Sequence, residues 1–182
     1  IIDTRHGSGA TVQPRRHWTA LGLGPTLARG LQADGDGAVG SLVRDAMDLR
    51  RALLLEMLGR AARALEGQRL DGPRQWVERA WACREDLPAF FVADREVIPF
   101  TLEAAGMLAS LWTLNALADS YLDVMAVVGA GLVVPPGYRD DHEAVLQALE
   151  RGEPAGAQAR FDGYLMALDA AILRCLPSRW RR

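Results

Sequence analysis

Apolar residues recur at every third or fourth position along most of this chain, from residue 39 to residue 176. That spacing puts apolar side chains on one face of a helix, so it predicts amphipathic helices that pack through those faces. Glycine and proline divide the pattern into runs near residues 67–73, 129–137 and 151–154. After residue 13 no stretch alternates as a strand does. The pattern therefore predicts an all-α fold, an antiparallel bundle of five or six helices.

Local signals set the expected helix ends. Gly67 is expected to end the first helix, and Pro73 to take the first position of the second. Asp86 is expected to cap the third. Pro99 lies inside that third helix and should kink it, because proline removes one backbone hydrogen bond. Apart from this third helix, the expected helices span 39–65, 74–84, 107–128, 138–151 and 154–176.

The first thirteen residues, IIDTRHGSGATVQ, differ from everything after them. Two short β-prone pieces flank a turn with two glycines, which predicts a β-hairpin over 1–13. A hairpin tip carrying Arg5, His6 and Gly7 could enter a DNA minor groove, where a narrow A·T tract attracts cations. An ordinary solvated turn is the alternative. Residues 14–38 are predicted to be a linker, 39–176 the helical domain and 177–182 a basic tail.

Composition alone excludes few classes of protein. A chain of 182 residues fits one domain, and its formal net charge of -2 does not indicate a polyanionic partner. Cys83 and Cys175 form no ligand spacing and are expected to be small core residues. No apolar run long enough to span a bilayer is free of charged residues. We therefore expect a cytoplasmic protein with no membrane contact.

A small set of polar residues on apolar helix faces marks a candidate site. Asp94 lies on an apolar face, and Ile98 follows one turn later on that face. His142 and Tyr164 lie equally far from Glu153, in the tight turn between the last two expected helices. If those helices are antiparallel, the two side chains face each other. Asp94, Ile98, His142 and Tyr164 are then expected to line one cavity.

The order of these pieces resembles the GntR superfamily of bacterial transcription regulators, in its FadR subfamily. Residues 5–12, RHGSGATV, are similar to the family's R-x-G-x-G-T-x-V wing string, with the threonine shifted. Residues 50–56, RRALLLE, are similar to R-R-x-L-E-P-E but replace E-P by two leucines. Residues 94–98 match D-x-x-x-H with isoleucine at the histidine. Residues 142–153 follow the family's last motif one position out of register, and Tyr164 stands at its closing histidine.

The resemblance implies a winged helix-turn-helix followed by an all-helical effector domain, in a homodimer that binds operator DNA. The three helices that precede the wing in this family are absent from the chain, which is expected to begin inside the DNA-binding domain. The short β-hairpin would be the remnant of that domain. DNA binding is therefore expected of the intact protein.

Many effector domains of this superfamily bind a divalent metal through one aspartate and three histidines. Of those four positions, only Asp94 and His142 keep a good donor here, because Ile98 has no donor atom and a neutral Tyr164 phenol is a poor ligand. We therefore predict no metal and no cofactor. Losing two imidazoles leaves a more apolar cavity. The metal-free FadR-type branch binds long-chain acyl-CoA in such a cavity, as the resemblance implies.

The predicted effector is thus a fatty acyl-CoA or another hydrophobic carboxylic acid derivative. Arg50 matches the family position that could meet its anionic group, and Asp94 and His142 would bind its polar part or pair with each other. Some large apolar residues could contribute to the walls, although plain core packing is the favoured interpretation for them. These residues are Phe90, Phe91, Met107, Trp112 and Tyr121.

Three other functions stay open at this point. The regulator could sense a small carboxylate, or the helical domain could be a protein-interaction module without an effector. A buried cluster of aspartate, histidine and tyrosine is also capable of acid–base chemistry. However, no motif places Ser120, Ser178 or either cysteine near a base, and there is no phosphate loop. We therefore do not expect an enzyme.

Overall fold

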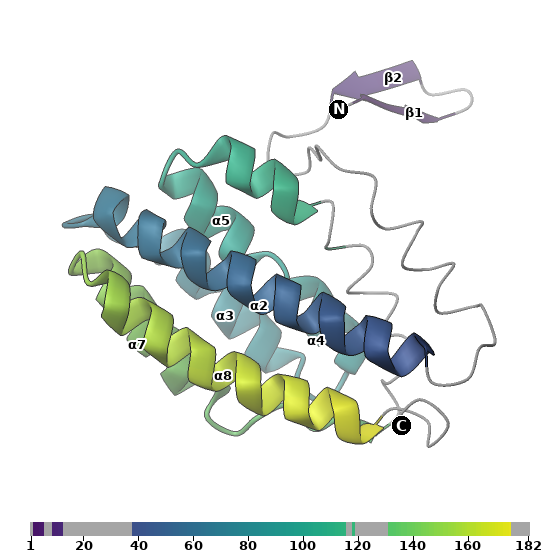
Figure 1. Cartoon of the computed structure of the whole chain (residues 1–182). Helices are drawn as coiled ribbons and strands as arrows, with labels where there is room; N and C mark the ends of the chain where they lie inside the picture. The colour runs from purple at the N-terminus through teal and green to yellow at the C-terminus, as the bar shows by residue number, and fades with distance from the viewer. Residues whose placement is uncertain (1, 6–8, 13–37, 116–117, 119–130, 176–182) are drawn as a thin grey trace.

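The computed structural model describes residues 2–5, 9–12, 38–115, 118 and 131–175. Within these residues the long C-terminal part is helical (Figure 1). The helices are α2 (Ala38–Leu65), α3 (Asp71–Ala82), α4 (Leu87–Asp94), α5 (Val97–Ala104), α7 (Tyr138–Glu150) and α8 (Pro154–Cys175). Residues 108–115 and 118 are also helical, and the rest of the expected helix 107–128 lies outside the described residues.

Two short strands precede the helices. β1 (Ile2–Arg5) pairs antiparallel with β2 (Gly9–Val12). Ile2 lies opposite Val12, and Arg5 opposite Gly9. Residues 6–8, where the tip was predicted, lie outside the described residues. The assignment of this pair as the wing of a DNA-binding domain stays a prediction.

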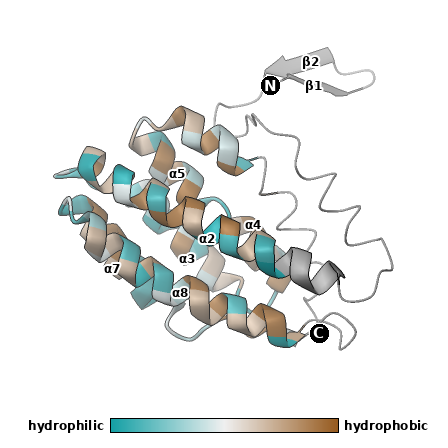
Figure 2. Ribbon diagram, viewed as in Figure 1, coloured by the Kyte–Doolittle hydropathy of each residue, from teal (hydrophilic) through white to brown (hydrophobic). Residues whose placement is uncertain are grey.

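The long helix α8 organises the bundle. It packs against α2 on one side and against α7 on the other, while α3 packs on α4, α5 and α7 (Figure 1). Hydrophilic and hydrophobic stretches recur along the helices, as expected for amphipathic helices (Figure 2). The largest fully buried side chains come from α2, α4, α5, α7 and α8 and from the segments between these helices. They are Tyr138, Phe90, Phe91, Leu58, Leu65, Leu70, Leu102, Leu111, Leu149, Leu165, Leu168 and Ile172.

Two of the expected proline effects need correction. Helix α3 begins at Asp71, so Pro73 lies inside its first turn and not at its first position. The N–H groups of a first turn have no acceptor within the helix, so proline is tolerated there. The predicted kink at Pro99 is a break: α4 ends at Asp94 and α5 begins at Val97. The break lies one turn before Pro99 because a proline ring clashes with the carbonyl four residues earlier.

Other helix ends follow the sequence signals. Asp86 is the N-cap of α4, and its carboxylate accepts a hydrogen bond from the Ala89 N–H at 3.2 Å. Gly67 follows the end of α2 with φ +76° and donates its N–H to the Glu150 carbonyl at 2.8 Å. The left-handed conformation therefore lets the end of α2 attach to the end of α7. None of the helices that the structure describes is long and apolar enough to cross a membrane.

Gly152 closes the turn between α7 and α8, and its replacement tests that turn. Its φ is +66°, and a Cβ added there would lie 2.9 Å from Glu66 Cγ. We expect Gly152→Ala to lower the free energy of unfolding by roughly 1–2 kcal/mol, because a left-handed backbone disfavours alanine. Urea denaturation followed by circular dichroism measures this.

Gly163→Ala is the matched control. Gly163 lies within α8, and nothing lies within 4 Å of its added Cβ. There alanine should raise stability by roughly 0.5–1 kcal/mol, because glycine is unfavourable in a helix interior. The same sign of change in both variants would contradict the left-handed turn at Gly152.

Candidate functional site

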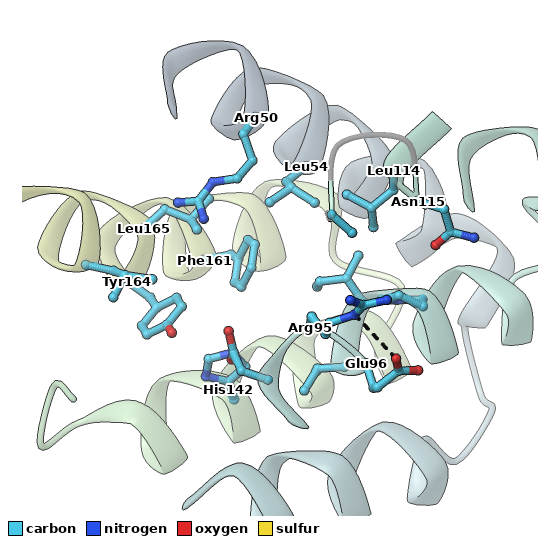
Figure 3. Close-up of a pocket in the computed structure, with 16 residues that line it drawn as sticks. Arg50, Leu54, Arg95, Glu96, Leu114, Asn115, His142, Phe161, Tyr164 and Leu165 are labelled. Atoms are coloured by element: carbon cyan, nitrogen blue, oxygen red, sulfur yellow. Dashed lines mark ion pairs between the residues drawn. The ribbon is translucent and has the colours of Figure 1, made fainter. Parts of the chain in front are cut away.

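A pocket of about 80 Å³ opens between the helices of the bundle. All five residues that the sequence predicted to bind a ligand line it: Arg50, Asp94, Ile98, His142 and Tyr164. Figure 3 shows three of them, Arg50 on α2, His142 on α7 and Tyr164 on α8, around the pocket. That these residues bind a ligand stays a prediction, but the structure brings all of them together.

The contact between α7 and α8 brings His142 and Tyr164 together as their equal spacing from Glu153 predicted. Their ring centroids lie 4.5 Å apart at an interplanar angle of 72°. Both side chains are buried, with relative exposures of 3%. Phe161, one turn before Tyr164 on α8, packs edge-on against His142 at 5.9 Å and also lines the pocket.

The wall residues differ from those considered from the sequence. Phe90 and Phe91 are buried in the core. Met107 and Trp112 pack, partly buried, against that core. None of these four is among the lining residues, and Tyr121 lies outside the described residues. The apolar lining comes from other positions. They are Leu54, Val97, Ile98, Pro99, Leu114, Ala118, Phe161, Leu165 and Leu168.

Tyr138 connects Asp94 and His142, and the sequence analysis missed it. Its hydroxyl donates to Asp94 Oδ1 at 2.8 Å. Its carbonyl oxygen lies 2.8 Å from His142 Nδ1, which must donate because a carbonyl only accepts. Tyr138 stands four residues before His142 on the same helix face, and that spacing was the available signal.

This hydrogen bond fixes the role of the other imidazole nitrogen. With Nδ1 donating, Nε2 of a neutral His142 is an acceptor, and it lies 3.9 Å from Asp94 Oδ1. Burial raises the pKa of Asp94, against the opposing effect of His142. Burial likewise lowers the pKa of His142, against the opposing effect of Asp94. Both shifts favour the neutral forms of this pair.

The titration of His142 tests this electrostatic balance. We expect its pKa to lie below the ordinary value of 6.5, since burial is the largest effect on it. Asp94→Asn should lower the pKa further, because it removes the nearest charge that favours the imidazolium. NMR of the imidazole ring nitrogens measures both the pKa and the tautomer.

Asp141→Asn is the matched control for this titration. Asp141 also raises the pKa of His142, but its effect is smaller than that of Asp94. The downward shift should therefore be smaller than in Asp94→Asn. A pKa of His142 above 6.5 in the unmodified chain would show that the carboxylate outweighs burial.

Two charged pairs border the pocket. Arg50 contacts Asp169 of α8, with 2.6 Å between Nη2 and Oδ1. Arg95 Nε lies 3.6 Å from Glu96 Oε1, the pair joined by the dashed line in Figure 3. Asp169 was not predicted as part of the site, because nothing in the local sequence shows that it meets α2.

The pocket does not fit a closed metal site. Asp94 and His142 supply two donor side chains, while Ile98 lines the same pocket without a donor atom. Among the described residues, no three histidine, cysteine, aspartate or glutamate side chains gather as a metal site would need. We therefore derive no role for a metal here.

Comparison with known protein families matches residues 45–165 to the FCD domain. The match covers more than half of the chain and includes all five predicted ligand residues. No curated protein and no solved structure matches the chain.

Proposed function

Because the chain belongs to the FCD domain family, the C-terminal domain of GntR-family transcription regulators, we propose that its pocket binds a small carboxylate that controls operator binding. The effector would carry its charge to Arg50 and its apolar body to the wall of leucines and Ile98. Within the superfamily, we propose a metal-free domain of the FadR type that acts as a homodimer and binds a small carboxylate where that branch binds an acyl-CoA.

The observation that carries this proposal is the part-buried Arg50 in a small pocket with a largely apolar lining. Arg50 is the family-matched cation, and its side chain is only 13% exposed. Around it the lining includes Leu54, Leu165 and Leu168. A guanidinium at an apolar wall suits a ligand with one carboxylate and a hydrocarbon body.

The size of the pocket favours one of the two effector classes that the sequence left open. Pockets for drug-sized ligands measure roughly 300–1,000 Å³. The pocket, at about 80 Å³, is well below that range. The prediction of a fatty acyl-CoA is therefore not supported, and we propose the small carboxylate in its place.

Isothermal titration with straight-chain acids from acetate to hexanoate tests the proposal. We expect measurable binding within this series, and none for butyramide, which has the shape of butyrate without the charge. Arg50→Gln should weaken the binding at least about tenfold, because hydrogen bonds to charged groups are worth roughly 1.5–3 kcal/mol.

Arg51→Gln is the matched control. Arg51 is the next residue on α2, but it does not line the pocket and contacts Asp162 at 2.9 Å. Its loss should leave affinity for the acids unchanged. Equal binding of butyrate and butyramide would contradict the role of Arg50. Tight binding of palmitoyl-CoA would restore the lipid effector. If none of these compounds binds, a protein-interaction module would be favoured.

The DNA-binding part of the proposal rests on the N-terminal hairpin. Arg5 ends β1, whereas His6 and Gly7 lie outside the described residues. Arg5→Ala combined with His6→Ala in the intact protein is expected to weaken operator binding and to reduce its salt dependence. Unchanged affinity across a salt titration would remove the wing assignment.

A further inference from the structure

Arg50 belongs to two environments at once. It lines the pocket, and it also forms an ion pair with Asp169, with 2.6 Å between Nη2 and Oδ1. Asp169 itself is not among the lining residues. Figure 3 shows the Arg50 side chain reaching from α2 towards Leu165 on α8. One guanidinium therefore stands between a protein carboxylate and the space where an effector would bind.

The guanidinium of Arg50 favours the charged form of Asp169. Its side chain is 14% exposed, and burial raises its pKa, while the charge of Arg50 is the largest effect that lowers it. The charge of Arg50 also reaches the other side of the pocket, where it lowers the pKa of Asp94. A carboxylate that entered the pocket would feel the same positive charge.

We propose that Asp169 is an internal competitor for the effector, occupying Arg50 in the ligand-free protein until an incoming carboxylate takes over the ion pair. This inference rests on the proposed function, because it concerns the same pocket and the same ligand class. The affinity that the effector shows is then reduced by the fraction of protein in which Asp169 holds Arg50.

The exchange would change how α2 is attached to α8. Arg50 and Asp169 connect these two helices, and Arg51 and Asp162 connect them a second time. Transfer of Arg50 to the effector removes the first connection and leaves the second. Ligand binding would therefore alter one contact of α2, which is the first helix after the N-terminal strands among the residues that the structure describes.

The test compares Asp169→Asn with Asp162→Asn in titrations with the same acids, acetate to hexanoate. Each variant removes one carboxylate charge from α8 that pairs with an arginine of α2. Asp169→Asn should bind the acids at least about fivefold more tightly than the unmodified chain, the lower end of typical coupling between sites. Asp162→Asn should bind them as the unmodified chain does.

The direction in which Asp169→Asn changes the affinity for the acids distinguishes competition by Asp169 from a purely structural role. A merely structural Asp169 would loosen the pocket when replaced, so affinity would fall or stay the same. The double variant with Arg50→Gln should lose the gain, because the guanidinium that Asp169 holds is no longer there to be released. Thermal unfolding of both single variants checks that each remains folded.

The outcomes also separate this inference from the proposed function. Binding by the unmodified chain with no gain in Asp169→Asn overturns the internal competitor and leaves the effector assignment standing. Binding by Asp169→Asn alone supports the competitor. Absence of binding in all variants overturns both.

Discussion

Replacement of Phe90 by alanine is expected to lower the free energy of unfolding by about 3–5 kcal/mol, the range for removing a large core side chain. Phe90 has no exposed surface. Its ring meets Phe91 at 5.2 Å and Tyr138 at 5.1 Å, both edge-on. The structure around it relaxes only partly, so a cavity remains. Urea denaturation followed by circular dichroism measures the loss.

The effect of Phe90→Ala should extend to the pocket. Phe90 supports Tyr138, whose hydroxyl bonds to Asp94. Val92→Ala is the matched control on the same helix, because Val92 is 57% exposed. Its cost should be within about 0.5 kcal/mol of zero, as for most surface substitutions. Similar costs for the two variants would show that α4 is not packed through the face that carries Phe90.

Replacement of Arg74 by alanine is expected to cost roughly 2 kcal/mol near neutral pH, between the values for exposed and for buried ion pairs. Arg74 of α3 donates to two glutamates of α7: Glu143 at 2.9 and 3.1 Å, and Glu150 at 2.6 and 2.8 Å. Without the guanidinium the two carboxylates would repel each other. Glu150 would keep its bond from the Leu70 N–H at 2.7 Å.

The stability that Arg74 contributes should depend on pH in a defined direction. Its hydrogen bonds hold the pKa values of Glu143 and Glu150 below their ordinary value of 4.5. Groups with lowered pKa values stabilise the folded state above the ordinary value, and that stability is lost as the pH falls through the lowered one. The difference between the unmodified chain and Arg74→Ala should therefore be full at pH 7 and shrink below pH 4.5.

Arg139→Ala is the control for this ion-pair cluster. Arg139 bonds to Glu78 between the same two helices, but the side chains are 50% and 56% exposed. An exposed pair is worth roughly 0–1 kcal/mol and is weakened by salt. Two results would contradict a stabilising role for the ion pairs of Arg74 between α3 and α7. One is a loss of stability in Arg139→Ala equal to that in Arg74→Ala, and the other is a loss in Arg74→Ala that does not vary with pH.

The predicted geometry agrees with the structure where it depended on spacing along one helix or across one short turn. A tight turn at Gly152 joins α7 to α8, so residues that are equally far from the turn along the two helices lie at the same level in the bundle. His142 and Tyr164 meet for this reason. Asp86 caps α4 because its side chain acts on the N–H groups of its own first turn. Such relations involve few degrees of freedom, so a sequence pattern can predict them.

The same sequence did not reveal Tyr138 as the hydrogen-bond donor to Asp94, nor Asp169 as the partner of Arg50. These pairs are separated by 44 and 119 residues along the chain. Each depends on how far two helices are rotated and shifted against each other, which periodicity leaves open. The break before Pro99 was also misplaced, because proline acts on the carbonyl one turn earlier.

By itself, the sequence determined the helical class, most helix ends and five of the residues that line the pocket, because periodicity, caps and breakers act within a few residues. Only the tertiary structure decided the volume of that pocket and the ion pair that Arg50 makes beside it. Both depend on side chains that distant helices bring together, and those distances follow from packing of the whole core.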